Sequence, residues 1–215
     1  GLEITFGIPN RKESITVYTV FPETIFGVTY MVLAPEHSLA EKLATKDHMD
    51  EVTAYIKGAK EKTELERKTL EKEKTGVFTG SYCINPVTGE EVPVWIGDYV
   101  IAAYGTGAVM GVPGSDHRDY AFAKKYNLDI KRVIGNAPDD NGTITGEEDV
   151  LEEGVLVNSG DFSGQKTPHP AREMIKDSLV EQGFAKRKVQ YHLHDWSVSR
   201  QRYWGTPVPM IHCPK

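Results

Sequence analysis

Short runs that alternate apolar and polar residues dominate the first third of the chain and predict strands. Residues 3–8 (EITFGI) and 14–21 (SITVYTVF) place β-branched and aromatic side chains at alternate positions. Residues 26–34 (FGVTYMVLA) predict a third strand. Residues 38–74 are highly charged instead, with apolar residues at roughly helical spacing, which predicts one or two surface helices.

The remainder of the chain mixes strands and helices. After Gly76 the runs VFTGSYCI and VPVWIGDYVIA, separated by NPVTGEE, predict a hairpin. Residues 117–126 have the acid-early, base-late charge order of a short helix, and residues 167–182 predict the last amphipathic helix. Many short strands with segregated helices indicate an α+β fold, either a small β-barrel or a curled sheet core with peripheral helices.

Composition narrows the class of protein. The chain has 215 residues, of which 39% are hydrophobic and 26% charged, as is ordinary for a soluble globular protein. No apolar run approaches the roughly 18 residues that span a bilayer, and the first residues, GLEITFGIPN, lack the pattern of an export signal. The two cysteines, Cys83 and Cys213, are too far apart in the sequence to suggest a metal site. We therefore expect a cytoplasmic protein with no membrane association and no metal.

The charge is unevenly distributed. A formal net charge of −6 argues against a general nucleic-acid binder. From residue 164 onward, however, nine Lys or Arg residues stand against four Asp or Glu residues. A solvated helix and strand with outward lysines explain such a run as well as a binding surface does.

Residues 104–120, YGTGAVMGVPGSDHRDY, combine glycines with a cluster of charged side chains. Gly105, Gly107 and Gly111 have the spacing G-x-G-x-x-x-G and are followed by Val-Pro-Gly, which argues against a dinucleotide-binding fingerprint. The first two glycines instead predict a sharp turn or a close approach of the backbone to a ligand, before a buried strand at residues 108–112.

Two carboxylates follow this strand at the start of the expected helix. Asp116 and Asp119 are three residues apart and so share a helix face. Asp116 is expected to cap the helix by accepting the backbone N–H of Asp119. The side chain of Asp119 is then left free, and in its charged form it can hold an ammonium group.

The turn TVFPET, residues 19–24, offers a second set of candidate groups. Thr19 and Thr24 lie on either side of Pro22. Each threonine carries a hydroxyl and a methyl on a rigid side chain, and so can serve both as a hydrogen-bonding group and as a steric stop. The alternative is that these are ordinary strand and turn threonines.

Five blocks together resemble bacterial-type leucyl-tRNA synthetase, in its editing domain, the connective polypeptide insertion. They are residues 17–37, 76–100, 104–126, 154–164 and 194–213, so the resemblance runs nearly end to end. The runs FGVTYMVLAPEH and RDYAFAKKY distinguish this family from the isoleucyl and valyl enzymes. The resemblance implies an editing domain over residues 1–195 and, at 196–215, a junction segment that returns to the class I catalytic core.

The resemblance also implies an activity. Post-transfer editing hydrolyses the ester of leucine tRNA that carries a wrong amino acid, such as norvaline, isoleucine or methionine. One methylene is worth only about 1 to 3 kcal/mol of discrimination, so a second sieve is needed, and aminoacyl-tRNA synthetases are the standard case of this principle. The implied partners are the 3′ end of leucine tRNA and the catalytic core of the same ligase. The domain itself needs no cofactor, although the parent enzyme binds ATP.

Roles for individual residues follow from the resemblance. Asp119 is expected to grip the α-ammonium group of the amino acid, and Thr24 to exclude the branched side chain of leucine. Thr19, with neighbouring backbone N–H groups, is expected to position the ester and stabilise its oxyanion. The resemblance implies no protein nucleophile, and it implies that a hydroxyl of the terminal ribose of the tRNA helps to orient the attacking water. Further positions expected to contact the substrate are Val20, Phe21, Tyr104, Met110, Val112 and Asp116.

The first block departs from the family pattern. The family usually has TTRPDT where this chain has TVFPET, so Val20, Phe21 and Glu23 replace threonine, arginine and aspartate. Loss of the arginine removes a phosphate partner. An alternative contact at this position is stacking of Phe21 on the terminal adenine. Ser115 occupies a position that is often histidine. These departures leave a second reading open, a tRNA-docking or structural module whose hydrolytic activity has lapsed.

Overall fold

The computed structural model describes residues 1–62, 67, 74–102 and 105–190. Its α-helices are α1 (Met49–Lys60), α3 (His117–Tyr126) and α4 (Ala171–Glu181), and its 3-10 helices are η1 (Pro22–Gly27), η2 (Glu147–Asp149) and η3 (Gly160–Phe162). Its strands are β1 (Leu2–Gly7), β2 (Ser14–Thr19), β3 (Tyr30–Leu33), β4 (Gly76–Ile84), β5 (Glu91–Gly97), β6 (Ala108–Gly111), β7 (Ile134–Gly135), β8 (Gly154–Leu156), β9 (Lys166–Thr167) and β10 (Ala185–Arg187).

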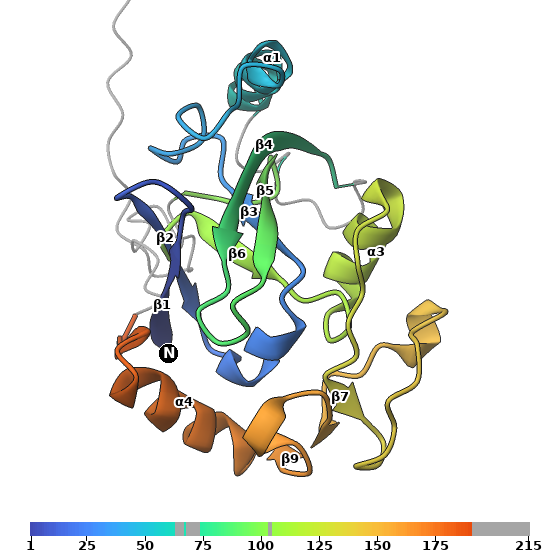
Figure 1. The fold of residues 1–215 in the computed structure, drawn as a ribbon. Helices are drawn as coiled ribbons and strands as arrows, with labels where there is room; N and C mark the ends of the chain where they lie inside the picture. The colour runs from blue at the N-terminus through green and yellow to red at the C-terminus, as the bar shows by residue number, and fades with distance from the viewer. Residues whose placement is uncertain (63–66, 68–73, 103–104, 191–215) are drawn as a thin grey trace, which may run out of the picture.

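A curled, mostly antiparallel sheet forms the centre of the molecule (Figure 1). Its strand order is β10-β1-β4-β5-β3-β6, with β2 paired to β1, and among the described strands only β3 and β5 run parallel. The outer strands β2 and β6 come into contact, but no hydrogen-bonded ladder joins them among the described strands. Of the two forms expected from the sequence, the structure is therefore the curled sheet and not the closed barrel. Strands β7, β8 and β9 form a smaller separate sheet.

The helices cover different parts of the sheet, with α1, α3 and α4 lying on three sides of it in Figure 1. The side chains of β3 are buried on both faces. Met31 and Leu33 belong to the largest core cluster, which also holds the apolar face of α4. Tyr30 and Val32 point the other way, into a cluster with Phe122 of α3. Strand β3 is thus the shared wall between the two cores that position the candidate site.

Some element boundaries match the expectations and others differ, among them the strands expected at 14–21 and 92–102, which end already at Thr19 and Gly97. The helix at 117–126 is confirmed, and both Gly105 and Gly107 have positive φ, 64° and 71°, as a sharp turn requires. The strand expected at 26–34 begins only at Tyr30, because Pro22 starts a 3-10 helix, where its missing N–H costs nothing. The last helix begins at Ala171, directly after Pro170, later than expected. The boundary proposed between residues 195 and 196 lies outside the described residues.

Candidate functional site

The start of α3 is capped by Asp116, as the sequence predicts. The Asp116 carboxylate accepts hydrogen bonds from the backbone N–H groups of Arg118 at 2.8 Å and Asp119 at 3.1 Å. The guanidinium of Arg118 also pairs with it, at 2.8 Å. Although burial acts in the opposite direction, these contacts hold the pKa of Asp116 below its ordinary value. Asp116 therefore remains charged and fixes the first turn, which carries Asp119.

The side chain of Asp119 is half-buried and is held by the backbone of the preceding strand. Its Oδ2 accepts the backbone N–H of Val112 at 2.9 Å, so the expectation of an entirely free carboxylate is wrong for this oxygen. Burial, and next the negative charge of Asp116, raise the pKa of Asp119 to about 6. At neutral pH the group is charged but poorly solvated, and a cationic partner would relieve that cost.

Thr19 and Thr24 both use their hydroxyls to shape the turn between them. The Thr19 hydroxyl accepts the backbone N–H of Phe21 at 3.0 Å, and the Thr24 hydroxyl donates to the Phe21 carbonyl at 2.8 Å. Thr24 is only 6% exposed. Its side chain is thus held in one orientation, as a steric stop requires. The N–H of Phe21 is already bound to Thr19 and is not free to serve as an oxyanion donor.

Val20 and Phe21 are exposed at the tip of this turn. They are 45% and 55% exposed, although the proline that follows them is buried. The structure therefore places both residues where a large ligand can reach them.

Met110 and Val112 lie on and directly after β6. Met110 is opposite Met31 of β3, and both Met110 and Val112 pack against the largest core cluster. Val109 of the same strand is 36% exposed, so the segment is less buried than expected. Tyr104, the remaining expected contact, lies outside the described residues.

These residues form two groups on neighbouring elements. One contains Thr19, Phe21 and Thr24, and the other contains Val112 and the two aspartates of α3. Strands β3 and β6 connect them, since η1 leads into β3 and the Thr29 N–H donates to the Gly111 carbonyl at 3.1 Å.

An ion pair that was not expected from the sequence joins the turn at residues 19–24 to helix α4. Glu23, 2% exposed, accepts two hydrogen bonds on Oε1 from Arg172 of α4, from Nη2 at 2.6 Å and from Nε at 2.9 Å. The guanidinium carbon of Arg172 also lies 4.9 Å from the centroid of the Phe21 ring. Arg172 follows Glu23 by 149 residues, so only the departure of Glu23 and Phe21 from the family pattern hinted at it.

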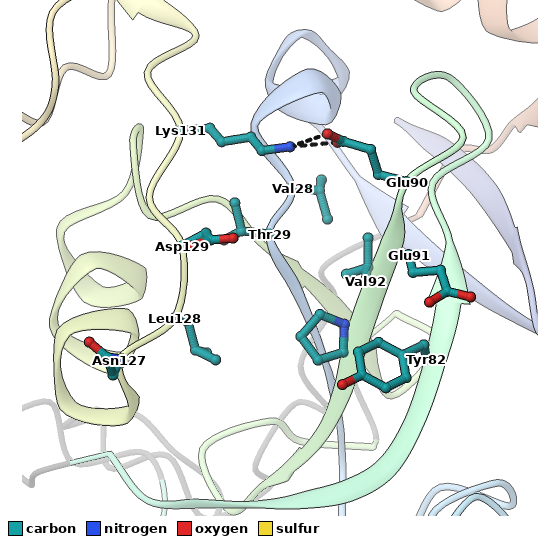
Figure 2. A pocket seen from close by; sticks show the side chains of 11 residues that line it. Val28, Thr29, Tyr82, Glu90, Glu91, Val92, Asn127, Leu128, Asp129 and Lys131 are labelled. Carbon is teal, nitrogen blue, oxygen red and sulfur yellow. Dashed lines mark hydrogen bonds and ion pairs between the residues drawn. The ribbon is translucent and has the colours of Figure 1, made fainter.

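A separate groove of about 340 Å³ lies between the β4–β5 hairpin and the segment after α3 (Figure 2). An ion pair between Lys131 and Glu90, 2.5 Å long, crosses one end of it, and Tyr82 lies at the other. None of the residues expected from the sequence to form the site lines this groove. Within the described part of the chain no cluster of potential metal ligands is found, and none of its helices is long and apolar enough to cross a membrane.

Comparison with known proteins gives a consistent result. The family model for the leucyl-tRNA synthetase editing domain matches residues 1–180. Leucine–tRNA ligases of Dehalococcoides mccartyi strain BAV1 and Caldanaerobacter subterraneus are 50% and 51% identical over the whole chain, which spans 26% of each. A solved LeuRS of Agrobacterium radiobacter K84, in a ternary complex with tRNA and LeuAMS, aligns with a TM-score of 0.67 and 31% identity, over the whole chain and 23% of that protein. The chain thus spans about a quarter of these relatives. It belongs to the leucyl-tRNA synthetase editing-domain family.

Proposed function

We propose that this chain carries out post-transfer editing, hydrolysing the ester that joins norvaline, isoleucine or methionine to leucine tRNA. The observation that carries the proposal is the carboxylate of Asp119, half-buried beside Val112 at the start of a capped helix, with a pKa of about 6. Family membership supports editing in general, and this carboxylate supplies a group suited to the α-ammonium of an aminoacyl ester.

Asp119 acts in this proposal as an anchor for the substrate. Its Oδ2 is fixed by the Val112 N–H, so the carboxylate has a defined position in which to accept from the ammonium group. The ion pair repays part of the cost of burying the charge, and it sets the position of the ester carbonyl relative to the rest of the site.

Thr24 acts as the sieve. Its hydroxyl is tied to the Phe21 carbonyl, so the side chain cannot rotate away to admit a larger substrate. Linear side chains pass this stop and the branched side chain of leucine does not. Met110 and Val112 complete the apolar wall.

The attacking group is water. Aminoacyl esters are reactive, so correct placement of a water against the carbonyl suffices, with a hydroxyl of the terminal ribose helping to orient it. Thr19 contributes through the turn, because its hydroxyl holds the Phe21 N–H, and through any backbone donor that the turn directs at the developing oxyanion. The partners in this reaction are the 3′ end of mischarged leucine tRNA and the catalytic core of the parent ligase.

The test follows the loss of ester from leucine tRNA charged with isoleucine, with correctly charged Leu-tRNA as the control. We expect this chain to hydrolyse the first and spare the second, and Asp119→Asn to hydrolyse neither. A chain that binds the tRNA but leaves both esters intact would instead support the alternative, a docking module whose hydrolytic activity has lapsed. The departure of TVFPET from the family pattern is the reason to consider that alternative.

A further inference from the structure

The turn at residues 19–24 presents a largely exposed aromatic ring with a cation against it. Phe21 is 55% exposed, yet the guanidinium of Arg172 lies 4.9 Å from its ring centroid. This distance is within the range of cation–π contacts. The ring is therefore backed by a flat cation, while more than half of its surface stays open to a ligand.

Arg172 is itself held firmly from the other side. Both of its donors to Glu23 reach the same oxygen, Oε1, and the Glu23 carboxylate is almost fully buried. The second oxygen, Oε2, is buried and accepts no hydrogen bond from the described residues. Among the described residues, Arg172 is thus the partner that compensates the buried charge of Glu23. This ion pair fixes the guanidinium next to the Phe21 ring.

The position of the ring suggests its ligand. Phe21 lies between Thr19 and Thr24, the two threonines proposed to shape the site, and its own N–H and carbonyl are bound by their hydroxyls. In an aminoacylated tRNA the ester and the terminal base are attached to the same ribose. A base stacks on an exposed aromatic ring without needing any specific hydrogen bond.

The geometry points to Phe21 as the stacking platform for the terminal base of the aminoacylated tRNA, with Arg172 and Glu23 as the residues that position it. This inference rests on the proposed function and adds the part of the substrate that the turn recognises. The turn TVFPET contains no basic residue, but the guanidinium of Arg172 from helix α4 lies beside position 21, where the family usually has an arginine. The cation supports the ring from inside the protein.

The test uses two stable probes in place of the tRNA. One is the norvalyl amide of 2′-amino-2′-deoxyadenosine, and the other is the same sugar amide without the base. We expect the unmodified chain to bind the probe with the base about 5- to 140-fold more tightly in calorimetric titration, the range of one stacked base. Phe21→Leu should bind the two probes equally.

Arg172 is tested by the same ratio. Arg172→Gln should lose most of the base dependence although Phe21 is present, and Arg172→Lys, which keeps the charge without the plane, should restore only part of it. Because Arg172→Gln leaves Glu23 unpaired, the double variant Glu23→Gln/Arg172→Gln is measured as well, with circular dichroism as the check on folding. It should show the same loss. Tyr82→Ala and Arg187→Gln, which remove an exposed ring of β4 and an exposed arginine of β10, should keep the full ratio.

Three outcomes overturn the inference. They are equal affinity of the unmodified chain for both probes, failure to bind either, and full base dependence in the folded Arg172 variants. The first of these, combined with hydrolysis of mischarged tRNA, leaves the proposed function standing without the platform. Base-dependent binding without hydrolysis of mischarged tRNA refutes the proposed function and leaves the stacking platform standing.

Discussion

The carboxylate of Asp119 is subject to opposite demands from folding and from substrate binding. Its pKa of about 6 is raised chiefly by burial and next by Asp116, so the charged form is disfavoured in the folded chain. A group with a raised carboxyl pKa supports the fold most fully below its unfolded pKa and loses that support as the pH rises through about 6. The charge that the proposed reaction needs is therefore carried at a cost in stability.

The first prediction is that Asp119→Asn abolishes hydrolysis and stabilises the fold. The amide oxygen can still accept the Val112 N–H, whereas the buried charge is gone. We expect a gain of up to about 3 kcal/mol in the free energy of unfolding near pH 7, and little gain near pH 4. Urea unfolding at both pH values measures it. A gain that is equal at the two values would mean that ionisation of Asp119 is not its source.

The pH dependence of hydrolysis follows from the same group. Because the ammonium of the substrate pairs only with the ionised carboxylate, we expect kcat/KM to fall tenfold per pH unit once the pH drops well below 6. A rate that stays level down to pH 5 would remove Asp119 from the role of anchor. Asp116, whose pKa is low, should contribute nothing in this range.

Thr24 allows bulk and hydrogen bonding to be separated. Thr24→Ala removes the methyl and the hydroxyl, so the site should begin to hydrolyse correctly charged Leu-tRNA. Thr24→Val keeps the shape and loses only the bond to the Phe21 carbonyl, and should still spare it. Deacylation of Leu-tRNA by both variants is the measurement. If Thr24→Ala also spares Leu-tRNA, the steric stop lies elsewhere, at Met110 or Val112.

The sequence was most informative about local structure. The order of charges predicted α3 and the cap at Asp116, because both depend on neighbouring residues. The bond from the Val112 N–H to Asp119 and the pair between Glu23 and Arg172 were not predictable from one sequence. They depend on how β6 meets α3 and how α4 packs on η1, and no local pattern encodes either arrangement.

At the scale of elements, the pair between Glu23 and Arg172 joins α4 to η1. Arg172→Met should cost about 3 to 5 kcal/mol of stability, because it leaves a buried carboxylate without its partner. Glu23→Gln/Arg172→Met should recover a large part of that loss. Thermal unfolding of the three proteins measures the difference. Equal loss in the single and double variants would show that the arginine stabilises through packing and not through its charge.

On the scale of the whole molecule, the acidic surface limits how the chain meets RNA. With a net charge of −6 the isolated chain should bind leucine tRNA that carries no amino acid only weakly. Its affinity should decrease only slightly as the salt concentration rises. Filter binding at several salt concentrations gives the slope, and we expect it to indicate no more than about three phosphate contacts. A slope equivalent to about six or more would mean that the basic residues after position 164 form a true RNA-binding surface.

The pairing of β1 with β10 brings residues 1 and 188 together. Lys188 and Gly1 exchange backbone hydrogen bonds, 3.0 and 3.1 Å long, across the edge of the sheet. A folded body whose first and last described strands are adjacent can be carried by another polypeptide within one surface loop, because the two sides of that loop need to stand apart by little more than the spacing of neighbouring strands. Such a body can be gained, lost or transplanted as a unit, and the host fold needs to supply only a place where its chain already turns back on itself.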